Sequence, residues 1–292
     1  MIITKLIGGL GNQMFQYAAG KALALKYNTS LKVDDSFLKK PAQGIDTQRY
    51  FELDIFEVPV LIASCNETEK YLKRVNNKFS RELQRRFPFL FKSLRAVESG
   101  STYHVEFERY PENTYLDGFW QSELYFAKYE NEIRNLFKFK KEIINRNLEL
   151  VSKINTAKNA VSIHVRRGDY INNPEANKFH GLCSLDYYTE AINLIKDKVS
   201  DVSLFVFSDD IPWCKNNFKF NLPIEFVETH NPHSDLYLMT RCKHNIIANS
   251  SFSWWGAWLN DNPDKIVVAP KQWFANKNID TKDVIPEKWI KL

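Results

Sequence analysis

The sequence lacks several features that would place it in a familiar class of protein. It contains no C-x-x-C pair, no run of 18 consecutive apolar residues, no internal repeat and no low-complexity linker. These absences argue against a dithiol redox motif, a transmembrane helix, a solenoid and a flexible tether. The four cysteines are widely spaced, which is typical of reduced thiols in a cytosolic protein. The start of the chain does not have the pattern of a secretory signal peptide, so a cytoplasmic location is expected.

The composition that is present is that of a globular protein. Of 292 residues, 44% are hydrophobic and 26% are charged. The net charge of +5, from 40 basic and 35 acidic residues, is too mild to indicate a nucleic-acid partner. The length suits one large domain or two of ordinary size.

Strand-like and helix-like segments alternate along the chain. The first 35 residues read as strand, glycine turn, helix and strand, and the second half repeats the alternation several times. This predicts an α/β protein of two doubly wound Rossmann-type units, 1–155 and 156–292. Residues 40–130 are less regular: 50–56 and 113–120 read as short strands, and the next segment, 122–139, reads as a helix.

One predicted strand ends on an unusual concentration of charge. In VSIHVRRGDY, residues 161–170, apolar and polar side chains alternate over the first five positions, as in a strand with one buried face. Two adjacent arginines repel each other unless an anion lies between them. The sequence therefore predicts an anion site at the carboxyl end of this strand, formed by His164, Arg166, Arg167 and Asp169.

Two further polar segments follow predicted strands: Asp209–Asp210, and NSSFS at 249–253. The carboxyl ends of parallel strands share one edge of a sheet, where ligands bind. Arginines neutralise phosphate in bidentate fashion, and hydroxyl and backbone N–H groups at a helix start add donors. Together these segments predict a metal-free site for a nucleotide diphosphate. Taken separately, the aspartates could cap a helix and NSSFS could be an ordinary turn.

The glycine turn at the start of the chain supports a competing interpretation. GGLGNQ partly matches the dinucleotide-binding pattern, with Gly9 and Gly11 in place and Asp34 as a candidate ribose-binding acid. A NAD-dependent oxidoreductase is therefore an alternative. Met14, which stands where the pattern needs a third small residue, counts against it.

Three other features have a structural and a functional interpretation. His230, His233, Cys242 and His244 are close in sequence, but their spacing matches no standard zinc site, so no metal is expected. The basic amphipathic segment 70–95 is interpreted first as a solvated helix and second as a peripheral membrane contact. The tryptophans of FSWWGAWL favour packing, although a non-catalytic glycan-binding protein would also use such rings: Trp254, Trp255 and Trp258.

Four motifs, in order, resemble those of the α-1,2-fucosyltransferases of glycosyltransferase family 11, in particular the bacterial members: GGLGNQMFQYAAGKALA, HVRRGDY, FSDD and NSSFSWWGAWL. The resemblance spans residues 1 to about 275. It implies a GT-B-like fold in which two units face a cleft, 1–155 on the acceptor side and 156–292 binding GDP-fucose. The absence of a D-x-D triplet agrees with a transferase that needs no metal.

The resemblance also implies residue roles. It puts Arg166 on the donor β-phosphate, His164 near the nucleotide, Asp209 at the guanine side and Asn12 near the fucose. Arg167 and Asp169 would organise the site, and the remaining donor contacts would come from Gly9, Gly11, Asn249, Ser250, Ser251 and Ser253.

The implied reaction is an inverting transfer of L-fucose from GDP-β-L-fucose to the 2-hydroxyl of a terminal galactose, in surface polysaccharide synthesis. Asp169 is the first candidate base, with Glu175 and His180 behind it. A fucosyltransferase of another linkage remains an alternative. The expected partners are the donor and a galactose-terminated glycan, which could be lipid-linked at the inner membrane face.

Overall fold

The structure of the protein is a computed structural model, and it describes residues 1–292 except 42–46, 73–81, 84–85, 88–89, 91–92 and 169–173. The chain forms two compact units. Unit 1 consists of Met1–Lys138 with Lys282–Val284, and unit 2 of Phe139–Thr281 with Ile285–Leu292.

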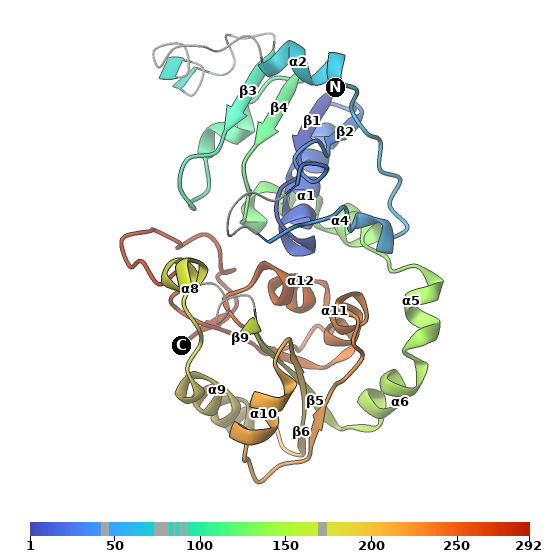
Figure 1. The fold of residues 1–292 in the computed structure, drawn as a ribbon, viewed down its shortest axis with the longest axis vertical. Coiled ribbons are helices and arrows are strands. Elements are labelled where there is room, and N and C mark those ends of the chain that lie inside the picture. The colour runs from blue at the N-terminus through green and yellow to red at the C-terminus, as the bar shows by residue number, and fades with distance from the viewer. Residues whose placement is uncertain (42–46, 73–81, 84–85, 88–89, 91–92, 169–173) are drawn as a thin grey trace. The chain divides into compact units, whose positions relative to one another are not determined.

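Unit 1 is built on a four-stranded parallel sheet in the order β2-β1-β4-β3 (Figure 1). Helix α1 packs on one face, and α2 covers the other through the contact of Tyr71 with Tyr115. The elements of unit 1 are β1 (Ile2–Lys5), α1 (Leu10–Lys26), β2 (Leu31–Asp34), η1 (Leu53–Ile55), α2 (Cys65–Leu72), β3 (Leu94–Val97), η3 (Val105–Arg109), β4 (Thr114–Asp117), η4 (Glu123–Tyr125), η5 (Ala127–Tyr129) and α4 (Glu130–Leu136).

Unit 2 is built on a six-stranded parallel sheet in the order β10-β9-β8-β5-β6-β7. Its elements are α5 (Lys141–Arg146), α6 (Leu148–Thr156), β5 (Asn159–Val165), α8 (Pro174–His180), α9 (Leu185–Lys198), β6 (Val202–Ser208), α10 (Ile211–Asn217), β7 (Ile224–Phe226), α11 (Pro232–Arg241), β8 (His244–Ile246), α12 (Ser251–Leu259), β9 (Val267–Ala269) and β10 (Ile290–Lys291).

Successive side chains of β5 point to opposite faces of this sheet, and each face is covered by helices. Val161, Ile163 and Val165 pack into one core with α9 and α10. Ser162 and His164 point to the opposite face, where Ser162 accepts a hydrogen bond from Asn245 and where α11 and α12 lie. The two central strands are therefore buried on both sides, as their apolar sequences predict.

Several local predictions are confirmed in unit 2. Ser184 caps α9, because its hydroxyl accepts a hydrogen bond from the Tyr187 N–H at 3.2 Å. The three tryptophans of α12 are 0–3% exposed, so they pack in the interior and are not available to stack on a sugar: Trp254, Trp255 and Trp258.

Other local predictions are wrong or fall outside the described residues. Segment 50–56 contains the 3-10 turn η1 and not a strand, and 122–139 is divided into η4, η5 and α4. The division between the units comes before α5 and α6, whereas residue 155 lies inside α6. Most of the basic segment 70–95 lies outside the described residues, and so does its expected membrane contact.

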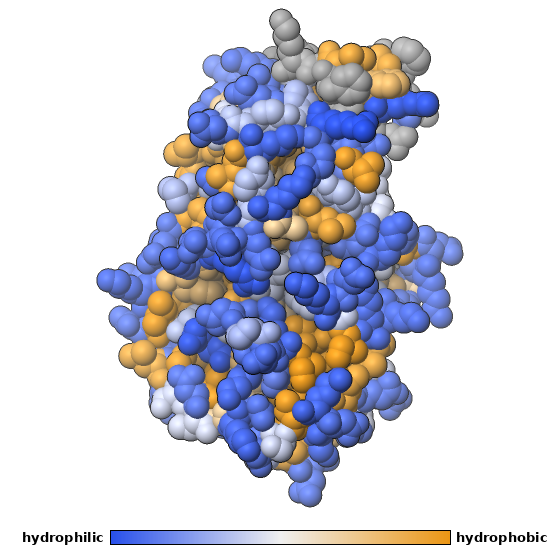
Figure 2. Space-filling model, turned by 180° about the vertical axis from the view of Figure 1, so that it is seen from behind, coloured by the Kyte–Doolittle hydropathy of each residue, from blue (hydrophilic) through white to orange (hydrophobic). Residues whose placement is uncertain are grey.

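The surface does not present a membrane-spanning element in the part of the chain that is described. Across those residues, no helix combines the length and the apolar character that crossing a membrane requires. On the face drawn in Figure 2, hydrophobic areas alternate with hydrophilic ones. Scattered apolar side chains of this kind are normal for a folded protein.

Candidate functional site

The candidate site lies where three neighbouring strands of unit 2 end. Val165 at the end of β5 is paired with Ser208 at the end of β6, and β8 pairs with β5 on its other side. The residues that follow these strands therefore meet at one edge of the sheet: 166–168, 209–210 and 249–253.

Arg166 is held by a carboxylate from the adjacent strand. Its Nη1 atom lies 3.0 Å from Oδ2 of Asp209, and both side chains are about one-quarter exposed, at 25% and 26%. The other Asp209 oxygen, Oδ1, accepts a hydrogen bond from the Arg167 backbone N–H at 2.8 Å. A Cβ atom at Gly168 would come within 3.1 Å of this carboxylate, so the turn leaves little room for a side chain there. Asp209 thus fixes both the direction of Arg166 and the path of the chain after β5.

Arg167 is held by a different set of contacts. Its Nε atom donates to Oδ2 of Asp210 at 3.2 Å, and its guanidinium group lies 3.8 Å from the ring centre of Trp213. Asp210 also caps α10, accepting a hydrogen bond from the Trp213 N–H at 3.1 Å. The capping interpretation of the second aspartate is therefore confirmed, and Arg167 is anchored to the start of α10.

His164 is a buried imidazole with an unsatisfied nitrogen. The residue is 5% exposed, and in the described part of the chain its Nδ1 atom has no hydrogen-bond partner. Burial lowers the pKa of His164 to about 4, with a further decrease from Arg166 and an opposing effect of Asp209. The ring is therefore neutral at pH 7. Its centre lies 5.5 Å from the ring of Phe252, at the beginning of α12.

The serine-rich segment begins α12. Ser250 is the N-cap residue, but among the described residues its side chain accepts no hydrogen bond from the helix. Ser250 and Ser251 are partly exposed, whereas Ser253 is fully buried and bonds back to the carbonyls of Ala248 and Ser250. The hydroxyls and first N–H groups of α12 form an anion-binding arrangement of the kind that helix N-termini provide.

Asn249 has a structural set of contacts. Its amide nitrogen donates to the carbonyls of His180, Gly181 and Trp273 at 2.8, 3.3 and 3.2 Å, and its oxygen accepts from the Cys183 thiol. It therefore joins the loop after α8 to the segment after β9.

The candidate bases are less completely described. Asp169 lies outside the described residues, and the side chain of Glu175 does as well. His180 is partly buried, and burial together with the positive charge of Arg166 lowers its pKa. Within the described ranges, no group of three His, Cys, Asp or Glu side chains is arranged to hold a metal ion.

The glycine turn of unit 1 has a different chemistry. The N-terminus of α1 is already occupied by an anion, because Oε2 of Glu52 accepts a hydrogen bond from the Leu10 N–H at 3.0 Å. Asp34 accepts bonds from the Tyr115 hydroxyl and the Ser36 N–H, so it is tied into the fold. Both features oppose the interpretation of this turn as a dinucleotide site.

The glycines in this turn differ in how much room the structure leaves for a side chain. Gly8, the first glycine of the turn, has a φ of +78°, and a Cβ there would lie 2.4 Å from Nδ2 of Asn12. At Gly9 the nearest atoms would be 3.8 Å or more away. Asn12 therefore folds back over Gly8, and its Oδ1 accepts from Gln121 at 2.7 Å.

Asp235 is a further charged group at the edge of the unit 2 sheet that sequence reasoning missed. It follows β7, in the first turn of α11, and Thr229 donates to its Oδ1 at 2.5 Å. Burial raises the pKa of Asp235 to about 6. A carboxylate kept in a position that disfavours its charge is a candidate for function. The segment SDLYLM predicts the helix but gives no sign of this burial.

The chain is similar to known glycosyltransferases. The model of the family described as Glycosyl transferase family 11 matches residues 70–292. The Escherichia coli alpha-1,2-colitosyltransferase is 37% identical over 306 residues, covering 100% of this chain and 99% of that protein. The Escherichia coli O-antigen biosynthesis glycosyltransferase WbnK is 38% identical over 307 residues, covering 98% and 99%. A Bos taurus galactoside alpha-(1,2)-fucosyltransferase 2 is 31% identical over 104 residues, covering 34% of this chain and 30% of that one.

Solved structures show the same fold at low sequence identity. A mutant of Arabidopsis thaliana FUT1 in complex with GDP has a TM-score of 0.56 and 12% identity, covering 95% of this chain and 72% of that one. NodZ alpha-1,6-fucosyltransferase co-crystallized with GDP has a TM-score of 0.50 and 16% identity, covering 87% and 90%. Together with the two parallel sheets, this confirms the predicted GT-B-like α/β fold.

Proposed function

Because the chain belongs to glycosyl transferase family 11, we propose that it transfers L-fucose from GDP-β-L-fucose to the 2-hydroxyl of a terminal galactose. The transfer inverts the anomeric centre and needs no metal ion. The observation that carries the proposal is the meeting of Arg166, His164 and the start of α12 at one edge of the unit 2 sheet.

The diphosphate of the donor occupies this edge in the proposal. The bond between C1 of fucose and the β-phosphate oxygen breaks, and its electron pair stays on GDP. Arg166, oriented by Asp209, faces the charge that develops there, and the hydroxyls of Ser250 and Ser251 with the N-terminus of α12 add donors. Preorganised cations of this kind provide the stabilisation that a divalent metal gives in other transferases.

The proposal assigns the guanine base to a carboxylate other than the one that holds Arg166. Asp209 is engaged by Arg166 and by the Arg167 N–H, so its proposed role is to orient the arginine. Asp235 is the better partner for the N1–H and amino group of guanine, because it lies in the first turn of α11, the helix that follows β7, and burial raises its pKa. Hydrogen bonds from these two donors would stabilise the ionised form of Asp235.

The acceptor oxygen attacks C1 from the side opposite GDP and loses its proton to a base. Asp169 is the proposed base, on the evidence of its position after Arg166 and Arg167. His164 is a poor candidate for the base, because burial lowers its pKa to about 4 and an imidazole with so low a pKa accepts a proton only weakly. If Asp169→Asn retains most of kcat, the proton leaves by another route.

A second donor is supported by a specific observation. The alpha-1,2-colitosyltransferase of Escherichia coli is similar to this chain over its whole length. Colitose is fucose without its 3-hydroxyl group, so both sugars would leave from the same nucleotide and differ at one contact. Colitose transfer is therefore the second candidate function.

The name of one relative supports a proposal for the setting of the reaction. One of them is named an O-antigen biosynthesis glycosyltransferase, which supports a role in surface polysaccharide synthesis. The acceptor would then be a galactose-terminated glycan, carried on a lipid at the inner face of the membrane.

The test uses the full chain with EDTA present. GDP-fucose and GDP-colitose are each offered with galactosides joined to GlcNAc, GalNAc or glucose, and the products are analysed for linkage by NMR. An α-1,2-fucosyl product supports the proposal. A colitosyl product formed at least tenfold faster would favour the second candidate, and an absolute need for a divalent metal would contradict the proposed mechanism.

A further inference from the structure

The turn after β4 in unit 1 has an unusual backbone. Trp120 adopts a φ of +55°, a conformation rarely taken by a bulky residue, although its side chain is fully buried. The preceding Gly118 is required by the packing, because a Cβ there would lie 2.3 Å from the Cβ of Glu98. Such local strain persists only where the surrounding structure holds it in place, and it is frequent at binding sites.

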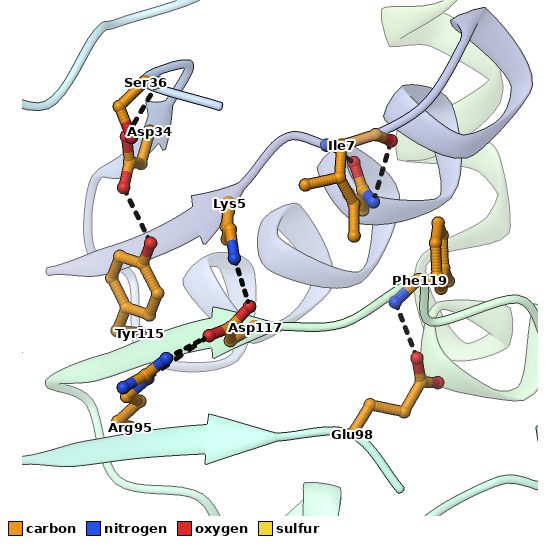
Figure 3. Close-up of polar contacts among 10 residues, drawn as sticks. Lys5, Ile7, Asp34, Ser36, Arg95, Glu98, Tyr115, Asp117 and Phe119 are labelled. Atoms are coloured by element: carbon orange, nitrogen blue, oxygen red, sulfur yellow. Dashed lines mark hydrogen bonds and ion pairs between the residues drawn. The ribbon is translucent and has the colours of Figure 1, made fainter. Parts of the chain in front are cut away.

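The side chain that holds this turn is Glu98, which follows β3. Its Oε2 atom accepts a hydrogen bond from the Phe119 N–H at 2.6 Å (Figure 3) and a second one from the Trp120 N–H at 2.9 Å. Glu98 is partly buried, and this burial raises its pKa. The carboxylate thus compensates two backbone donors at a position that is unfavourable for its own charge.

The consequence of the turn is the exposure of one aromatic ring. Trp120 is 0% exposed and packs against Tyr125 and Phe107, whereas Phe119 is 44% exposed. Burying both rings would be expected from hydrophobicity alone. The strained turn therefore presents Phe119 to the surroundings on a rigid base.

Phe119 follows β4 at the carboxyl edge of the unit 1 sheet, the edge at which parallel α/β sheets bind ligands. Strand β4 lies between β1 and β3, so its carboxyl end is beside the glycine turn that follows β1. Gln121, two residues after Phe119, donates to Asn12 of that turn at 2.7 Å. The exposed ring and the two bonded amides therefore belong to neighbouring turns at the same edge of the unit 1 sheet.

Charged side chains near this edge are paired with one another. Asp117 at the end of β4 bonds Arg95 and Lys5, and these contacts outweigh burial and hold the pKa of Asp117 below its ordinary value (Figure 3). An edge with an exposed ring, amides and paired charges suits an uncharged ligand that has one apolar face and several hydroxyls. A pyranose has this chemistry.

We propose that Phe119 is the stacking platform for the terminal galactose of the acceptor, and that Glu98 is a positioning residue that holds the ring in place. The inference rests on the proposed function, which it extends by naming an acceptor subsite. Phe119 contacts the apolar face of the sugar, and Asn12 with Gln121 lies beside its hydroxyls.

The first experiment measures transfer kinetics with a β-galactoside acceptor for Phe119→Ala and Phe119→Trp. Phe119→Ala is expected to raise the acceptor KM roughly tenfold. The KM for the donor and the Kd for GDP should stay within twofold. Phe119→Trp, which keeps a ring, should stay near the parent protein.

Phe37→Ala is the matched control, because Phe37 is 48% exposed and follows the outer strand β2. It is expected to leave all constants unchanged. An acceptor KM that is unchanged in Phe119→Ala, or that rises equally in Phe37→Ala, would overturn the inference.

The second experiment tests Glu98 by rescue. Glu98→Gln keeps an oxygen that can accept from both N–H groups and should stay within about threefold of the parent acceptor KM. Glu98→Ala leaves the two donors without this partner and should raise the acceptor KM as Phe119→Ala does, with little change in kcat. Equal effects of the two substitutions, or a fall in kcat alone, would contradict the positioning role.

A binding measurement separates this inference from the proposed function. Saturation-transfer NMR of methyl β-galactoside with GDP present needs no turnover. If the parent protein binds the galactoside and Phe119→Ala does not, the subsite is supported even if the transferred sugar is not fucose. If Phe119→Ala binds as the parent does while the parent transfers fucose, only the inference fails. If the parent neither binds the galactoside nor transfers fucose, both fail.

Discussion

The two units end their parallel sheets on turns that lead into helices, but the helix N-termini at these edges carry opposite chemistry. In unit 1 the start of α1 is occupied by the carboxylate of Glu52. In unit 2 the start of α12 carries the partly exposed residues Ser250 and Ser251, and Arg166 directly follows β5, the strand that pairs with β8. Since a helix N-terminus attracts anions, one edge is already satisfied by the protein and the other is suited to a phosphate.

This difference shows why the glycine pattern alone was a poor guide. The turn after β1 matches part of a dinucleotide-binding motif, yet Glu52, which lies 42 residues after Leu10, fills the anion position. The turn after β5 contains a single glycine and matches no phosphate loop, yet this turn carries the two cations, Arg166 and Arg167. The identity of the group at the helix N-terminus is therefore more informative than the number of glycines before it.

The largest expected effect is at Arg166. Arg166→Lys keeps the charge but loses the planar bidentate geometry, and Arg166→Ala loses both. We expect kcat/KM to fall about 10²-fold in the first variant and about 10³-fold or more in the second, as for the loss of a transition-state donor. Steady-state kinetics with GDP-fucose measure this. Nearly full activity in Arg166→Lys would mean that the arginine does not contact the diphosphate.

The next largest expected effect is at His164, whose lowered pKa should make the free energy of unfolding depend on pH. Its folded pKa of about 4 lies below the value of 6.5 for the unfolded chain, so its contribution is fully present above pH 6.5. That contribution is lost as the pH falls toward 4, and it amounts to about 2–4 kcal/mol. Urea denaturation of His164→Asn between pH 7.5 and 4.5 should give a visibly smaller loss of unfolding free energy than the parent protein. Identical slopes would contradict a neutral, buried imidazole at the site.

Asp235 should change the pH dependence of stability in the direction opposite to that of His164. Its folded pKa of about 6 lies above the unfolded value of 3.8, so the contribution to stability is present below pH 3.8 and is lost as the pH rises through 6. At pH 7.5, Asp235→Asn should therefore be more stable by about 1–2 kcal/mol, while it binds GDP more weakly. Thermal unfolding and calorimetric titration measure the two effects. Stabilisation without weaker GDP binding would leave Asp235 as a structural residue with no contact to guanine.

The smallest expected effect is in unit 1 at Glu52. Glu52→Ala should lower the free energy of unfolding by about 1 kcal/mol, because the first N–H of α1 loses its anionic partner. The Kd for GDP should not change. Glu52→Gln keeps the hydrogen bond and loses the charge, so its free energy of unfolding should lie between those of the parent protein and Glu52→Ala. Weaker GDP binding in either variant would place the nucleotide nearer to unit 1 than proposed.

Much of the unit 2 edge could be predicted from the sequence because the relevant signals are local. Alternation in 161–165 fixes which side chains share a face, and parallel pairing then brings the strand ends together. Helix capping by Ser184 and Asp210 follows from residues three positions apart. These relations need no knowledge of the tertiary structure.

The features that could not be predicted join residues that are distant in sequence. Glu52 reaches Leu10, and Glu98 reaches the amides after β4, although nothing near either glutamate indicates such a partner. The partial burial of Asp235 depends on the packing of α11 against α5, α6 and α12. Segment 50–56 has the aromatic and β-branched composition of a strand but folds as η1, because tertiary packing overrides a weak local preference.

The most direct test of the central claim is thermal unfolding of the parent protein, Arg166→Ala and Glu52→Ala, each with GDP, UDP or NAD in the presence of EDTA. A ligand at 100 times its Kd stabilises the folded protein by about 2.7 kcal/mol. We predict that GDP stabilises the parent and Glu52→Ala but not Arg166→Ala, and that UDP and NAD have much smaller effects. Stabilisation by NAD that Glu52→Ala alters, or GDP stabilisation that persists in Arg166→Ala, would contradict a nucleotide diphosphate site at the edge of unit 2.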